Sequence, residues 1–185
     1  MNVTRGIGLM VAALVFLIDQ LMKLYVVSTL GVNHDLVREA LKGGYVPDSP
    51  AQTLLPIFDL RFVPNIGVSL GLMNATSESM RWGLVALTSA IAAGVVWWML
   101  RERKLGDIVA LGMVLGGALG NILDRTRLGY VVDFADLHFG QWRPFLVFNV
   151  ADAAITIGVL VLLVRALFLR EKTPAGQDPV ENLNA

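Results

Sequence analysis

The sequence predicts a helical membrane protein: a bundle of four transmembrane helices with a small β-rich subdomain outside the membrane, between the first and second helices. Of the 185 residues, 55% are hydrophobic and only 16% are charged, and the mean hydropathy is +0.63. A soluble domain of this length needs more charge on its surface. Four long apolar segments cover residues 7–30, 82–100, 108–123 and 153–169. Because crossing a bilayer takes about 20 helical residues, we expect the last two helices to extend into their polar flanks.

The composition also restricts the chemistry that this chain can perform. It has no cysteine, which excludes disulfides, thiol catalysis and thiolate metal sites, and its two histidines are too few for a histidine-rich metal site. The formal net charge is zero, so there is no global electrostatic case for binding nucleic acid. Carboxylates, hydroxyls and amides remain as the reactive groups.

The basic residues predict how the chain crosses the membrane. The turn between the second and third apolar segments is Arg101–Lys104, and Arg5 precedes the first segment. Cytoplasmic loops carry an excess of Lys and Arg, so four crossings place both termini in the cytoplasm. The basic residues Arg125, Arg127 and Arg143 fall on the opposite side and need another explanation.

The two outer segments differ in character from the helices. Residues 31–80 form the expected insert, in which Leu54 to Val63 favours short strands and His34 to Leu41 favours a short helix. We expect residues 1–172 to form a single membrane-embedded domain. Residues 173–185 are polar and contain two prolines, so they are expected to be a disordered cytoplasmic tail.

Polar residues at membrane depth are the main functional signal, since an ionisable group there costs at least about 2.5–3.5 kcal/mol. Asp19 and Lys23 are four residues apart on one helical face and are able to pair. Asn121, Asp124 and Arg125 share a face at the outer end of the third helix. A salt bridge between Asp124 and Arg125 is the simple alternative to a functional role for these two residues.

More polar residues surround the start of the fourth helix. Asn149 is a good N-cap for that helix, and Asp152 follows three residues later. Asp152 could be only a favourable charge in the first turn. Asp133 and Asp136 lie in the outer stretch before it, where Asp133 could be a plain loop carboxylate. With four crossings, all of these groups converge on the outer leaflet.

Two kinds of mechanism suit a group of carboxylates near the outer surface. Two aspartates that share one proton activate water and protonate a leaving amine, which is aspartic peptidase chemistry. Alternatively, the acids relay protons or cations in a small carrier. A carrier predicts repeat symmetry and polar groups near the midplane of several helices, whereas this sequence has no repeat and its polar groups gather at one side. A non-enzymatic membrane assembly factor is a third alternative.

Several motifs resemble one family, the lipoprotein signal peptidases (signal peptidase II). The order and spacing match over roughly residues 7–170, and the matching stretches are Asp19-Gln-Leu-Met-Lys23, Asn65-Ile-Gly67, Gly116-Gly-Ala-Leu-Gly-Asn121-Ile-Leu-Asp124-Arg125, Val-Val-Asp133-Phe and Phe148-Asn149-Val-Ala-Asp152. The resemblance implies a catalytic pair, Asp133 and Asp152. It implies a supporting and substrate-binding shell of Asn65, Asn121, Arg125 and Asn149. It implies structural roles for Asp19, Lys23 and Asp124. It implies no metal and no organic cofactor.

The resemblance also implies what the enzyme acts on and where. The expected substrate is a prolipoprotein whose cysteine carries diacylglycerol, cut just before that cysteine by an intramembrane aspartic endopeptidase. The expected location is the bacterial inner membrane, with the active site towards the outer leaflet, contact with membrane lipid, and a monomer as the working unit. Two features depart from the family pattern: Leu70 stands at a usually aromatic position, and the segment 33–53 is longer than expected.

The predicted topology is testable with reporter fusions. Fusions after Gly44 and after His138 are expected to report an extracytoplasmic position, and a fusion after Arg103 a cytoplasmic one. The measurement is the activity of paired reporters that are active on only one side of the membrane. A cytoplasmic signal at either of the first two positions would contradict both the topology and the outer location of the site.

Overall fold

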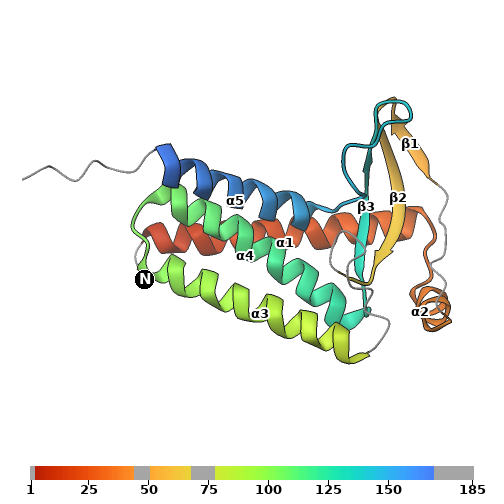
Figure 1. The fold of residues 1–185 in the computed structure, drawn as a ribbon, viewed down its shortest axis with the longest axis horizontal. Helices are drawn as coiled ribbons and strands as arrows, with labels where there is room; N and C mark the ends of the chain where they lie inside the picture. Colours follow the sequence, from red (N-terminus) through yellow and green to blue (C-terminus); the bar gives the residue numbers. More distant parts are fainter. Residues whose placement is uncertain (1–2, 44–50, 68–77, 169–185) are drawn as a thin grey trace, which may run out of the picture.

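A computed structural model describes residues 3–43, 51–67 and 78–168. Four long helices run side by side, and a small sheet stands across one end of the bundle (Figure 1). The tail 173–185 and Leu70 lie outside the described residues. The described part of the chain therefore consists of a helical bundle with a small sheet and a short helix at one end.

Each of the four long helices is long and apolar enough to cross a membrane. They are α1 (Val3–Thr29), α3 (Glu78–Arg101), α4 (Leu105–Arg127) and α5 (Val150–Phe168). The four predicted spans are confirmed, and α4 and α5 do extend into their polar flanks. The start of α1, the α3–α4 turn and the end of α5 all lie at the end of the bundle away from the sheet (Figure 1). Which of the two ends faces the cytoplasm stays a prediction.

Helix α4 is the most buried of the four spans. In its most apolar stretch 56% of the residues are buried, against 17–22% in the other three spans. Its glycines allow this close packing. A Cβ atom on Gly112 would lie 2.5 Å from the backbone oxygen of Gly8 on α1, and one on Gly117 would lie 2.5 Å from that of Ala151 on α5. Small residues of this kind let helix backbones approach closely within a membrane. Helix α4 is thus held tightly between α1 and α5.

The sheet has three antiparallel strands in the order β1-β2-β3. The first two, β1 (Gln52–Leu55) and β2 (Phe58–Asn65), confirm the strands predicted in the insert. The third, β3 (Val131–Leu137), comes from between α4 and α5. The predicted β-rich subdomain is thus present, and it also includes a strand from between α4 and α5. Asp133 lies in this buried strand and is not the plain loop carboxylate of the alternative interpretation. Residues 131–136 are all buried, on both faces of the strand. The sequence therefore lacks the alternation of polar and apolar residues by which a half-exposed strand is recognised.

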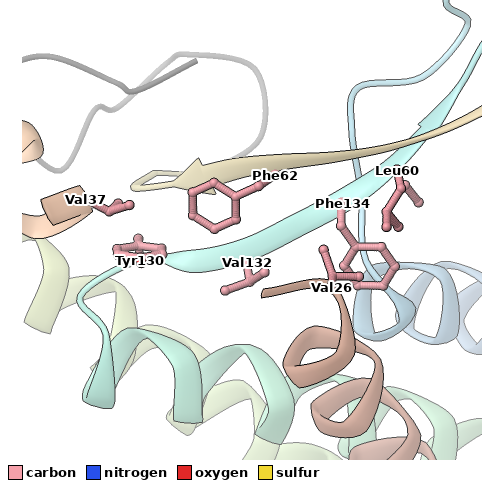
Figure 2. Close-up of a cluster of buried hydrophobic side chains, with 8 residues drawn as sticks. Val26, Val37, Leu60, Phe62, Tyr130, Val132 and Phe134 are labelled. Carbon is pink, nitrogen blue, oxygen red and sulfur yellow. The ribbon is translucent and has the colours of Figure 1, made fainter. Parts of the chain in front are cut away.

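The short helix α2 (His34–Lys42) confirms the helix predicted in the long outer segment. Asn33 caps it by accepting hydrogen bonds from two backbone N–H groups of its first turn. Its Val37 joins a hydrophobic cluster with Val26 of α1, Phe62 of β2 and Tyr130 beside β3 (Figure 2). This cluster holds the sheet and α2 against one end of the bundle, and it thereby fixes the position of β3.

Candidate active site

Asn149 is hydrogen-bonded to both of the predicted catalytic aspartates. Its side-chain Nδ2 donates to Oδ1 of Asp133 over 2.6 Å, and its backbone N–H donates to Oδ2 of Asp152 over 3.3 Å. Asp133 is on β3 and Asp152 is in the first turn of α5. The structure thus brings together two acids that are 19 residues apart in the sequence.

The start of α5 has the geometry of a capping box. Asn149 Oδ1 accepts the backbone N–H of Asp152 over 2.9 Å, while the Asp152 carboxylate accepts the backbone N–H of Asn149. Such reciprocal bonds satisfy two N–H groups that have no partner within the helix. The predicted N-cap role of Asn149 is confirmed. Asp152 is therefore held in place by the way the helix begins.

Two further asparagines complete the contacts of the acids. Asn65 Nδ2 donates to Oδ2 of Asp133, and Asn121 Nδ2 donates to Oδ1 of Asp152, each over 2.9 Å. Each of the four carboxylate oxygens of the pair thus receives one N–H. Val63 lies opposite Asp133 in the β2–β3 ladder, so Asn65, two residues further along β2, points to the same face of the sheet.

Burial and charge make Asp133 hold its proton more tightly than an ordinary aspartate. Its side chain is only 3% exposed, whereas Asp152 is partly exposed. Burial, and after it the negative charge of Asp152, raise the pKa of Asp133 to about 7. The hydrogen bonds from Asn65 and Asn149 act against this rise. Near neutral pH the pair is therefore able to carry a single proton.

A buried ionic cluster lies next to the pair and is linked to it through Asn121. Lys23 Nζ is 2.8 Å from Oδ2 of Asp19 and 2.8 Å from Oδ2 of Asp124, and all three side chains are no more than 5% exposed. The predicted pairing of Asp19 with Lys23 is confirmed. The alternative salt bridge between Asp124 and Arg125 is wrong, because the carboxylate of Asp124 turns towards Lys23 on α1.

The ionic cluster holds the backbone on both sides of the site. Asp19 Oδ1 accepts the N–H of Ala151 in the first turn of α5 over 2.9 Å. Asp124 Oδ2 accepts the N–H of Val132 on β3 over 3.2 Å. Ala151 and Val132 each immediately precede one of the two catalytic candidates in the sequence.

Lys23 also fixes an amide of the site. Its Nζ donates to Oδ1 of Asn121 over 3.2 Å, and Asn149 Nδ2 donates to the same oxygen over 3.3 Å. Because Lys has no acceptor, the oxygen of Asn121 must face it, which leaves the amide N–H₂ of Asn121 to donate to Asp152.

Two residues complete the surroundings of the pair. Arg125 donates from Nη2 to the backbone oxygen of Gly67 over 3.0 Å and lies close enough to Asp133 and Asp152 for its charge to act on them. Gln20 was missed by the sequence analysis. Its amide donates to the carboxylates of Asp19 and Asp124 over 3.1 Å each. Its position beside Asp19 within the Asp19-Gln-Leu-Met-Lys23 stretch was the available signal.

Within residues 3–43, 51–67 and 78–168, no group of three or more His, Asp or Glu side chains is arranged to hold a metal ion. The site that the described residues form is made of carboxylates, amides and one guanidinium. Four apolar spans with such a site at one end of the bundle define a polytopic membrane protein with a carboxylate-centred site.

Comparison with known proteins gives the family. The model of the signal peptidase (SPase) II family matches residues 11–168, and the chain belongs to this family. It is therefore a membrane peptidase, a hydrolase.

Individual relatives match this chain over nearly its whole length. A lipoprotein signal peptidase of Rhizorhabdus wittichii is 51% identical over 98% of this chain and 95% of the relative. One of Sphingopyxis alaskensis is 49% identical over 92% of this chain and 89% of the relative. A solved bacterial membrane enzyme superposes with a TM-score of 0.69 at 25% identity, covering 90% of this chain and 95% of that one. The relatives confirm the predicted family, and the solved structure confirms the predicted fold.

Removing Asp19 tests whether the ionic cluster is structural. In Asp19→Ala, Lys23 loses one of its two carboxylates and the N–H of Ala151 loses its acceptor, so we expect a loss of stability of about 3 kcal/mol. The measurement is the amount of folded protein in the membrane and its melting temperature. Turnover per folded molecule is expected to stay within about tenfold of the wild-type value. Asp19→Asn keeps an acceptor for Ala151 and is expected to be milder. Normal protein levels with abolished turnover would instead indicate direct participation in the chemistry.

Proposed function

We propose that this membrane peptidase removes the signal peptides of prolipoproteins by an aspartic mechanism in which Asp133 and Asp152 form the catalytic pair. The observation that carries this proposal is the set of hydrogen bonds around the two carboxylates, joined through Asn149. A pair of acids that carries one proton has both functions that peptide hydrolysis needs, a base and an acid.

The two acids differ in a way that suggests their roles. Asp133 is the more buried and has the raised pKa, so it is the member that carries the shared proton in the resting enzyme. Ionised Asp152 then removes a proton from water, and the resulting hydroxide adds to the peptide carbonyl. The C–N bond breaks as Asp133 gives its proton to the leaving nitrogen. The proton taken from water stays on the pair, which regains its starting charge.

The proposed substrate fits the place of the pair in the fold. Asp152 lies in the first turn of α5, a span, so the scissile bond is cut where a membrane helix begins. A cysteine that carries diacylglycerol keeps its acyl chains among the lipids while its backbone enters this site, and cleavage just before that cysteine frees its amino group. Asn65, Asn121 and Arg125 supply the supporting and substrate-binding groups. We propose that the site faces the outer leaflet of the inner membrane, with both termini cytoplasmic, and that the enzyme works as a monomer.

The pair is tested by exchanging each acid for its amide. Asp133→Asn and Asp152→Asn are each expected to abolish cleavage of a diacylated prolipoprotein, with a loss above the roughly 10²–10⁴-fold typical of general acid–base assistance. The double variant is expected to be no worse than either single one, since residues that act as a unit are not additive. The measurement is cleavage by purified protein in detergent or lipid, together with substrate binding and melting temperature.

The structure decides which control to use. Asp136, three residues from Asp133, is buried and accepts two hydrogen bonds from Arg143, so Asp136→Asn is expected to retain activity but to lower stability. Asp35 on α2 has a side chain that is 89% exposed, so Asp35→Asn is the matched control for loss of one carboxylate. If Asp136→Asn is inactive while Asp133→Asn still cleaves, the assignment of the pair is wrong. If both members of the pair tolerate the exchange, the aspartic mechanism fails.

The raised pKa of Asp133 predicts the pH dependence. The active pair holds one proton, and Asp133 loses this proton as the pH rises through about 7. We expect kcat/KM to fall about tenfold per pH unit above that value and to change little just below it. The measurement is kcat/KM for one lipopeptide substrate from pH 5.5 to 9. A rate that stays constant up to pH 9 would contradict the proposed role of Asp133 as the acid.

A further inference from the structure

A crevice of about 500 Å³ lies between α2 and the outer ends of α3 and α4, beside the sheet. Four basic side chains and one acidic side chain line it: Arg38, Lys42, Arg81, Arg127 and Glu78. In a chain whose formal net charge is zero, this gives a local excess of three positive charges (four minus one). Such a concentration of positive charge favours an anionic ligand.

The fold holds the basic residues at this place. Arg38 of α2 donates to the backbone oxygens of Leu128 and Arg127 over 3.1 and 2.7 Å, so it satisfies carbonyls at the C-terminal end of α4 and fastens α2 over that end. The chain then turns at Gly129, whose φ of 91° favours glycine, and an added Cβ there would lie 3.2 Å from Nη1 of Arg81. The crevice is therefore a defined part of the fold.

The acidic partners of these residues leave much of the positive charge available. Arg38, Lys42 and Arg81 pair with Asp35, Glu39 and Glu78, whose side chains are 89%, 76% and 78% exposed. Exposed ion pairs of this kind are weak. Arg127 has no acidic partner among the described residues, and Nε of Arg81 is buried without a hydrogen-bond partner.

The height of the crevice in the bundle indicates the source of the anion. Arg81 lies in the first turn of the span α3, and Arg127 is the last residue of the span α4. Neighbouring Trp82 is 47% exposed, as expected for a tryptophan at the membrane–water interface. Apolar Leu41 and Ile66 also line the crevice. A ligand with a charged head and an apolar body at this level is a membrane lipid.

The crevice accounts for the last of the three basic residues that the topology left unexplained. Arg125 bonds the backbone oxygen of Gly67 within the candidate active site, and Arg143 bonds Asp136. Only Arg127 of the three had no assigned partner, and it lines this crevice.

We propose that the crevice binds the phosphodiester headgroup of an anionic glycerophospholipid of the outer leaflet. Arginine guanidinium groups suit phosphate oxygens through paired hydrogen bonds. The bound lipid fastens α2 to the bundle. It also lies beside the candidate active site, since Ile66 on the crevice wall follows Asn65. This proposal does not depend on the aspartic mechanism.

The test compares lipid binding to the purified full-length protein by native mass spectrometry. The probes are phosphatidylglycerol and phosphatidylcholine with the same acyl chains. The wild type is expected to prefer phosphatidylglycerol. The variant Lys42→Gln/Arg127→Gln, in which one side chain is 74% exposed and the other is also exposed, is expected to lose about 30-fold in affinity for it, or about fivefold per residue. The matched control Arg101→Gln/Arg103→Gln removes two exposed charges at the other end of the bundle and is expected to keep the preference.

The outcomes decide between sources of the anion. Equal binding of the two lipids by the wild type, or an equal loss in the control variant, would overturn the proposal. Displacement of phosphatidylglycerol by millimolar inorganic phosphate or by a short acidic peptide would assign the site to a free anion or to a protein partner instead. If the double variant does not fold, Arg127→Gln alone is expected to show the fivefold loss, and its absence would contradict the lipid site.

Discussion

The first turn of α5 is the constraint on which the rest of the site depends. A helix that starts against other helices leaves backbone N–H groups that must find partners within the protein. Asn149 and Asp152 satisfy two of them reciprocally, and Asp19 of α1 accepts a third from Ala151. The groups that satisfy this helix start therefore include one member of the proposed catalytic pair. Asn149, which caps the helix, also binds the other member, Asp133.

The ionic cluster below the site follows from the same requirement. One ammonium group, on Lys23, lies between two carboxylates, and all three are almost fully buried. Such a cluster is costly unless each charge is paired and hydrogen-bonded. Here the two carboxylates also accept backbone N–H groups of α5 and β3, so the cluster sets the position of both acids. Residues that sequence reasoning assigns to structure thus determine the geometry of the chemistry.

Hydropathy predicted the spans well, because length and apolar composition determine whether a helix crosses a membrane. Asn149 was predicted as a cap because capping depends on local sequence. Strand β3 could not be predicted in this way, since its burial on both faces removes the alternation that marks a strand. The ion-pair partner of Asp124 was also missed. The sequence suggested its neighbour Arg125, whereas the packing of α4 against α1 places Lys23 beside it. The proximity of Asp133 to Asp152 rested on family motifs, because it depends on the sheet.

In the proposed mechanism Asp133 and Asp152 share one proton near neutral pH, and Asp133 holds it. Infrared difference spectroscopy of the C=O stretch of protonated carboxylic acids measures this directly in the full-length protein, with a pH titration from 5 to 9. We expect one carboxylic acid band that disappears with a midpoint near pH 7, as the pKa of about 7 requires, and that is absent from Asp133→Asn. A band that persists in Asp133→Asn, or a pair that is fully ionised already at pH 5, would contradict the account.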